Sequence, residues 1–270
     1  MTKYFLDTTI IADSLLKGKA AAAVIRQKLS AGQSELPMFA MREFKAGPLR
    51  YWVYAHNKIA TTKSFHRMLE AIYRLSRTPR RYLTSSSLQA LQLAVSQSLA
   101  NRSIAALSAK YGSKADLDVA VADEVRLQLY RTIMVAWKKR HQVATTSVCP
   151  LPCYSEADPY MKRGLIELDP TACVANPCCL TSLLRADQNS LSKLHVANQD
   201  MPVSAETTRR GRVLKDILTK KNHQLSEREC SDLGDALFAF FAPQDAVILT
   251  TNTKDHEPLA AALGKSVDRP

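Results

Sequence analysis

The sequence predicts an α/β fold in which helices cover both faces of a central parallel sheet and a mostly helical insertion interrupts the chain. Two observations carry this prediction. Strand-like and helical segments alternate at both ends of the chain, as they do where helices connect parallel strands. The middle of the chain reads instead as a run of helices. With 270 residues, of which 46% are hydrophobic, the chain can bury a sizeable core.

The N-terminal segment begins with a predicted strand. Lys3 to Ile11 is a short apolar run with β-branched residues, broken by Asp7, which we expect at the end of the strand. Residues 20–29 have helical spacing, and residues 35–39 predict a second short strand. The helix that follows should carry Glu43 in its first turn.

The C-terminal segment alternates in the same way. Residues 214–221 predict a helix, and Ser226 to Glu229 form a capping box that starts a helix reaching about Phe241. Residues 245–250 predict a buried strand, and residues 257–263 a last helix.

The middle of the chain divides into two parts. Residues 60–147 read as almost wholly helical, whereas residues 148–203 are rich in Pro, Cys, Asn and Asp and predict irregular structure with short helices. The sequence therefore predicts one domain formed by both ends of the chain, with an insertion between them: residues 1–60, then a basic insertion 61–204 with a Cys-rich segment 149–179, then residues 205–270.

Acidic and amide side chains occur where a parallel sheet would gather them. Ligands collect at the carboxyl ends of parallel strands, and several carboxylates brought together repel one another unless a cation lies between them. Hard oxygen ligands suit Mg²⁺ or Mn²⁺. The candidates are Asp7, Glu43, Asp232, Asp235, Asn252 and Asp255.

Four segments in order resemble the PIN-domain nucleases. Residues 4–11 resemble the opening strand with its Asp and a hydroxyl two residues later, and residues 38–44 resemble a second motif with Glu at a helix start. Residues 235–239 resemble the third motif, an Asp opening a hydrophobic helix, and residues 249–255 resemble the last, a strand ending in Thr. The resemblance covers roughly residues 1–60 and 205–270.

The resemblance implies a PIN-like α/β/α sandwich and a nuclease dependent on Mg²⁺ or Mn²⁺, usually acting on RNA. It implies a catalytic set of Asp7, Glu43, Asp235 and Asn252, with Thr9 and Thr250 in support and Asp232 and Asp255 as further metal ligands. The chain departs from the family in three ways: 191 residues separate Glu43 from Asp235, an amide stands at Asn252, and His256 replaces an aromatic residue.

The positive charge lies in the middle of the chain. The formal net charge is +12, and residues 44–148 alone carry 17 basic and 5 acidic side chains. Such a surplus favours a polyanion partner, although a solvated helical surface explains it equally well. For Trp137 we expect a place in the core. The residues that we expect to contact RNA, tRNA among the candidates, are Arg74, Arg77, Arg80, Arg81, Lys138, Lys139 and Arg140.

Five of the six cysteines lie in residues 149–179. Paired thiolates at the two ends of a loop can bind structural Zn²⁺. The usual tight spacing of two residues is missing, so ordinary buried cysteines compete with this interpretation. The candidate zinc ligands are Cys149, Cys153, Cys173 and Cys178.

Together these features predict a metal-dependent endoribonuclease, acting as a toxin or defence effector, with an antitoxin or inhibitory protein among its partners. Two alternatives stay open: a non-catalytic RNA-binding or scaffold protein with a degraded site, and a structure-specific DNA nuclease. No apolar stretch is long enough to span a membrane, and Asp7 comes too early for a signal peptide. We therefore expect a cytoplasmic protein with no membrane partner, and a homodimer stays open.

Overall fold

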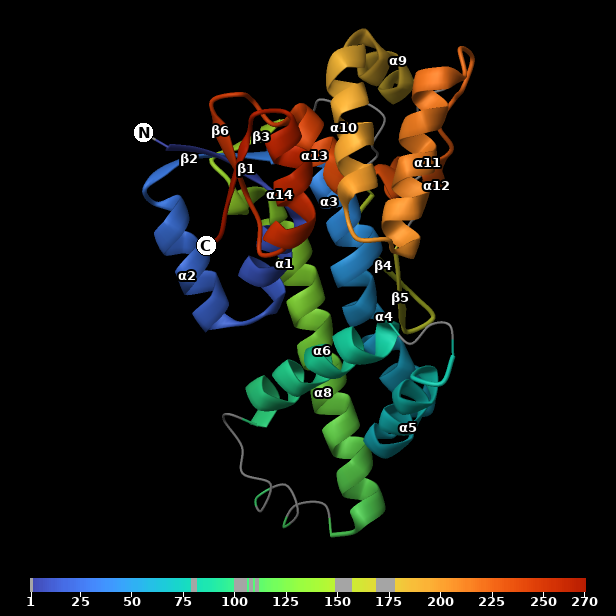
Figure 1. Ribbon diagram of the computed structural model, residues 1–270. Helices are drawn as coiled ribbons and strands as arrows, with labels where there is room; N and C mark the ends of the chain where they lie inside the picture. The colour runs from blue at the N-terminus through green and yellow to red at the C-terminus, as the bar shows by residue number, and fades with distance from the viewer. Residues whose placement is uncertain are drawn as a thin grey trace.

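A computed structural model describes residues 2–78, 82–99, 106, 109, 112–148, 157–168 and 178–270 (Figure 1). The sheet lies at one end of the molecule, and the helices of the central segment extend away from it. None of the described helices is long and apolar enough to cross a lipid bilayer.

The larger of two sheets is five-stranded and parallel, with strand order β3-β2-β1-β6-β7. A two-stranded antiparallel sheet lies apart from it. This confirms the predicted α/β class with a parallel sheet. The strands of the large sheet are β1 (Thr2–Leu6), β2 (Gly32–Pro37), β3 (Thr146–Val148), β6 (Ala246–Leu249) and β7 (Ser266–Asp268), and those of the small sheet are β4 (Tyr160–Lys162) and β5 (Leu165–Glu167).

The centre of the large sheet is a topological switch point. After β1 the chain adds β2 and β3 on one side, and then returns to place β6 and β7 on the other. Such sheets bind ligands in the crevice at the carboxyl ends of the two strands where the direction reverses. Those two strands are β1 and β6, so residues 7 and 250 lie where a ligand is expected.

Most of the described chain is helical. The segments before residue 144 are α1 (Thr8–Leu16), α2 (Lys19–Leu29), α3 (Met38–Phe44), the π-helical η1 (Lys45–Leu49), α4 (Arg50–Thr62), α5 (Phe65–Leu75), α6 (Tyr82–Leu99), α8 (Lys114–Lys139) and the 3₁₀ segment η2 (Arg140–Val143). Those after it are α9 (Cys179–Ala186), α10 (Gln188–Asp200), α11 (Ala205–Thr219), α12 (Glu227–Leu233), α13 (Asp235–Phe241) and α14 (Thr253–Ala262).

The first strand ends at Leu6, as predicted, and the Asp7 side chain accepts the amides of Thr8 and Thr9 and so caps α1. Two predicted boundaries near the other acidic residues were wrong. Helix α3 starts at Met38, which puts Glu43 near its end rather than in its first turn. The capped helix stops at Gly234.

Gly234 separates two helices that the sequence predicts as one. Its φ of 43° lies in the region that only glycine adopts easily. The predicted capping box is confirmed, since Ser226 and Glu229 satisfy each other's backbone amides at the start of α12. A new helix, α13, then begins at Asp235. Asp232 and Asp235 therefore lie on two different helices and not on the one continuous helix that the sequence predicts.

Three phenylalanine rings hold together the elements that carry the acidic residues. Phe5 of β1, Phe39 of α3 and Phe238 of α13 pack with centroid separations of 6.4, 6.4 and 4.6 Å. Phe5 precedes Asp7 by two residues, Phe39 precedes Glu43 by four, and Phe238 follows Asp235 by three. At these spacings each ring lies on the same side of its element as the acid. The packed rings thus bring three distant segments to one place.

The central segment differs from the predicted insertion at two points. The boundary after residue 60 falls inside α4, which packs against α6 and α8. Strand β3 pairs with β2, so the central segment supplies an edge strand of the large sheet. Within the described part of residues 148–203, α9 and α10 agree with the short helices that the sequence predicts there.

Candidate functional site

Asp7 lies at the centre of a hydrogen-bonded cluster between β1 and β6. Its side chain is buried, and its backbone amide donates to the Leu249 carbonyl at 3.0 Å. The hydroxyls of Thr9 and Thr250 both donate to Asp7 Oδ2 at 2.7 Å. Burial disfavours the charged carboxylate, but hydrogen bonds from His256 and these threonines outweigh it and lower the pKa of Asp7. Thr9 and Thr250, which the resemblance implies as supporting residues, therefore both contact Asp7.

Glu43 reaches the same place from α3. Its Oε2 accepts the Thr8 hydroxyl at 2.8 Å, and Thr8 directly follows Asp7 in the chain. Burial and then the charges of Asp7 and Asp235 raise the pKa of Glu43 to about 8. The charge of His256 opposes this rise but does not cancel it.

Asp235 is the third acid, at the start of α13. Its Oδ2 accepts a hydrogen bond from Arg210 Nη2 at 2.8 Å, and its Oδ1 lies 3.2 Å from His256 Nε2. The structure therefore gathers Asp7, Glu43 and Asp235 in one site, although they come from three distant segments.

His256 takes a place that the sequence did not predict. It is buried on α14, and its Nε2 lies 3.6 Å from Asp7 Oδ1 as well as close to Asp235. Burial alone would lower its pKa, but the two carboxylates raise the pKa of His256 to about 10. The imidazole is thus a cation that bridges two acids of the site. The available signal in the sequence was that a histidine stands at position 256, where the resembled motif has an aromatic residue.

Arg210 is the second residue that sequence reasoning missed. It is 1% exposed, and besides Asp235 it donates to Glu206 at 3.0 Å. Nothing in the local pattern sets it apart from the exposed basic residues around it, because only the packing of α11 against α12 brings it to the site.

The chemical types of the donors fit a hard divalent cation. Three carboxylates with supporting hydroxyls are the ligands that Mg²⁺ and Mn²⁺ prefer, and burial together with the neighbouring carboxylates raises the pKa of Glu43. The ligand atoms of Asp7, Glu43 and Asp235 do not all lie within 4.8 Å of one another, so one ion can bind all three only if they move closer together. A second condition concerns His256. Because His256 Nε2 already lies against two of the acids, a bound ion must replace its contacts with Asp7 and Asp235.

The other predicted site residues, Asp232, Asn252 and Asp255, do not belong to this group of three acids. Asp232 pairs with Arg209 at 2.8 Å. The Asn252 side chain donates to Asp255 Oδ2 at 2.7 Å in an exposed position, while its backbone amide donates to the Thr250 hydroxyl. Asn252 therefore supports the loop after β6, and its side chain is engaged with Asp255.

A cavity of about 670 Å³ adjoins the acidic group. Its lining includes Thr8, Thr9 and Thr251, and also Trp52 of α4 and Leu93 of α6. Its volume falls in the range of pockets that bind small molecules or parts of larger ones. Part of the central segment therefore forms a wall next to Asp7.

The residues predicted to contact RNA differ in where the structure places them, and two of them lie outside the described residues. Arg74 lies on the exposed part of α5, and the Arg77 guanidinium lies 5.8 Å from the ring centre of Tyr73. Lys138 and Lys139 are exposed at the end of α8. Arg80 and Arg81 lie outside the described residues.

Arg140 corrects the prediction of an exposed basic cluster. It is 7% exposed, and its guanidinium stacks 3.7 Å from the ring centre of Trp137. Trp137 itself is 1% exposed, which confirms its predicted place in the core. Arg140 therefore belongs to the core of the central segment and not to a surface that RNA can reach.

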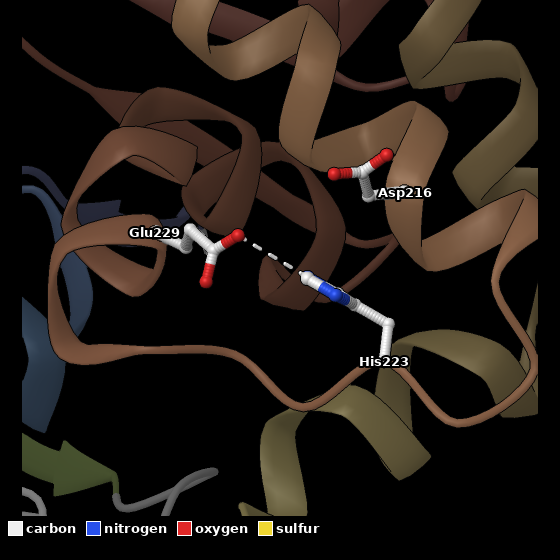
Figure 2. Close-up of side chains that lie close together, drawn as sticks. All are labelled: Asp216, His223 and Glu229. Carbon is white, nitrogen blue, oxygen red and sulfur yellow. Dashed lines mark ion pairs between the residues drawn. The ribbon is translucent and has the colours of Figure 1, made fainter.

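The predicted zinc ligands stay untested. Cys149, Cys153 and Cys173 lie outside the described residues, and Cys178 is a partly buried free thiol. Within the described ranges, the only three His, Cys, Asp or Glu side chains whose ligand atoms all lie within 4.8 Å of one another are Asp216, His223 and Glu229 (Figure 2).

Comparison with family models, curated proteins and solved structures finds nothing that matches this chain.

Proposed function

We propose that the chain is a Mg²⁺- or Mn²⁺-dependent endoribonuclease of the PIN type. One observation carries the proposal: Asp7, Glu43 and Asp235 converge at the carboxyl ends of β1 and β6, where parallel sheets bind their ligands. A divalent ion held there would activate water and neutralise charge on a phosphodiester.

The side chains around the three acids have distinct roles in this proposal. Thr9 and Thr250 fix the Asp7 carboxylate, and Thr8 does the same for Glu43. Arg210 orients Asp235 from the side opposite His256, because the two bind different carboxylate oxygens. His256 holds the acids together through the proton on Nε2 while no divalent ion is bound.

The central segment would supply substrate binding. The cavity beside Thr9 and Thr251 can accept part of an RNA chain next to the acids. Arg77 with Tyr73 offers a cation and an aromatic face, which together hold phosphates and unpaired bases. A tRNA substrate, a toxin or defence role, an inhibitory protein partner and a cytoplasmic location belong to the same proposal.

A second candidate is a non-catalytic RNA-binding protein. The observation that favours it is the internal neutralisation of the acids, since His256 and Arg210 already supply positive charge to Asp7 and Asp235. In that case the acids would stabilise the fold without binding a metal. A DNA nuclease of related fold shares the acidic group and differs in substrate.

A cleavage assay separates these candidates. The full chain is incubated with total RNA, tRNA or branched DNA in Mg²⁺, Mn²⁺ or a chelator. We expect metal-dependent cleavage of RNA, and a loss of about 100-fold or more for Asp7→Asn. The matched control is Asp245→Asn, because Asp245 is an exposed carboxylate that lies 3.8 Å from Lys3.

Three outcomes would contradict the nuclease proposal or its RNA substrate. Cleavage by Asp7→Asn at the rate of Asp245→Asn would remove the acidic group as the active site. RNA binding without cleavage in any metal would favour the non-catalytic candidate. Cleavage of branched DNA alone would favour the DNA nuclease.

A further inference from the structure

A second cluster of metal-binding groups lies away from the acidic site. Asp216 comes from α11, Glu229 from α12, and His223 from the loop that joins the two helices (Figure 2). One ligand atom of each lies within 4.8 Å of the others, and all three side chains are partly buried. Three separate stretches of chain therefore point their polar ends at one small space.

The His223 nitrogen faces this space without a hydrogen bond. Nε2 is buried and makes no hydrogen bond, although Glu229 Oε1 lies only 3.3 Å away. A short separation without a hydrogen bond is compatible with two ligands of a common ion. Ligands at about 2.0–2.1 Å from a tetrahedral ion lie roughly 3.4 Å apart.

The capping box fixes which oxygen of Glu229 is free to bind. Oε2 accepts both the Ser226 amide at 2.9 Å and the Ser226 hydroxyl at 2.6 Å, which leaves Oε1 toward His223. Burial opposes the charge, but these hydrogen bonds outweigh it and lower the pKa of Glu229. The carboxylate is therefore ionised at neutral pH, as a metal ligand must be.

The loop is also held in position by its backbone. The His223 amide donates to the Lys220 carbonyl at 2.9 Å, which closes a turn after α11. Lys220 pairs with Asp216 Oδ1 at 3.0 Å, but its side chain is 61% exposed, so this pair lies on the solvent side of the cluster. Two carboxylates with one imidazole thus face a partly enclosed space.

We propose that Asp216, His223 and Glu229 bind a first-row transition-metal ion, with Zn²⁺ the best match to one imidazole and two carboxylates. The ion would fasten the loop 220–226 to α11 and α12. Helix α11 carries Arg210, which binds Asp235, so the same ion would steady one contact of the acidic site. The proposal does not depend on nuclease activity.

The test is Zn²⁺ binding by the full chain, measured by isothermal titration calorimetry and by the shift in melting temperature. We expect His223→Gln to bind Zn²⁺ at this cluster about 100-fold more weakly or worse. The variant should therefore bind one equivalent of Zn²⁺ fewer than the unchanged chain. Zn²⁺ should raise the melting temperature of the unchanged chain more than that of the variant. The control is His66→Gln, because His66 is exposed and lies 3.4 Å from a single carboxylate, Glu70.

Further variants keep the result unambiguous. Glu229→Gln retains an oxygen that accepts the Ser226 amide, and it should also fail to bind this Zn²⁺ ion. It tests the same site if the His223→Gln variant folds poorly. Zn²⁺ held by cysteines or by Asp7 and its neighbours would persist in both variants. Equal binding by the unchanged chain, His223→Gln and Glu229→Gln would overturn the proposal. No binding by the unchanged chain would overturn it too, and would leave His223 as a neighbour of Glu229 alone.

Discussion

His256 Nε2 lies 3.2 Å from Asp235 Oδ1, so the acidic site contains its own cation. The same nitrogen also lies 3.6 Å from Asp7 Oδ1. An ion that enters the site competes with this imidazolium, and the balance between them decides how strongly the site binds metal.

Replacing His256 by Gln should strengthen Mn²⁺ binding. The variant removes the competing charge and keeps a side chain that can donate to one carboxylate. We expect a dissociation constant at least about 10-fold lower, which corresponds to about 1.4 kcal/mol. Electron paramagnetic resonance of Mn²⁺ measures it, in a His223→Gln background so that the second cluster does not contribute.

Replacing His256 should also lower the free energy of unfolding when no metal is bound. Removing one partner of a buried ion pair typically costs about 3–5 kcal/mol, because the other charge stays buried. Mn²⁺ should restore part of this loss. Weaker Mn²⁺ binding by the variant would show that His256 supports the metal site instead of competing with it.

Replacing Glu43 by Gln should stabilise the protein at high pH. The pKa of Glu43 rises from 4.5 to about 8 on folding. Its protonated form is therefore favoured in the folded state, so its contribution is complete below pH 4.5 and is lost as the pH rises through 8. Gln imitates the protonated form and retains an acceptor for the Thr8 hydroxyl.

We expect the gap in free energy of unfolding between Glu43→Gln and the unchanged chain to grow by at least about 1 kcal/mol from pH 5 to pH 9. Urea unfolding with a chelator present measures it. The control is Glu257→Gln, since Glu257 is exposed on α14. A gap that stays constant with pH would contradict the placement of Glu43 among uncompensated charges.

Gly234→Ala should destabilise the protein by about 1–3 kcal/mol, because the backbone at φ 43° is strained for any residue with a Cβ. Asp235 directly follows, so metal binding or cleavage should fall as well. Thermal unfolding gives the first effect. Gly47→Ala is the matched control, as an added Cβ there meets nothing within 4 Å. Equal stability of the two variants would show that the break in the helix is not needed.

Arg77→Glu should weaken tRNA binding and lower the slope of log affinity against log salt by about 1. Arg26→Glu changes the net charge by the same amount on an exposed part of α2 and should have little effect. Fluorescence anisotropy with labelled tRNA between 50 and 200 mM salt, about the range over which such contacts respond, measures both. Identical slopes would exclude Arg77, which lies just after α5, as an RNA contact.

The acids of the site could be predicted because each belongs to a local pattern. Asp7 follows an apolar strand, and Asp235 opens a hydrophobic helix. An isolated glycine within a helical pattern was the available signal for the break at Gly234, but the strong capping box before it favoured one continuous helix. Local sequence patterns thus predicted the acidic residues of the site more accurately than they predicted where the helices end.

The charged partners of these acids could not be predicted, because tertiary packing alone brings them close. Arg210 reaches Asp235 only when α11 packs against α12, and His256 reaches it only when α14 packs against α13. Strand β3 escaped notice for a related reason: it has three residues, and its pairing with β2 defines it.

The parallel pairing of β1 with β6 joins residues 3–6 to residues 246–249, which are distant in the sequence. A nascent chain that has emerged only as far as α8 presents Asp7 and Glu43 but lacks Asp235, Arg210 and His256. The three acids with their charged partners can therefore assemble only after α14 has been synthesised. An enzyme built in this way would be inert until that helix has left the ribosome.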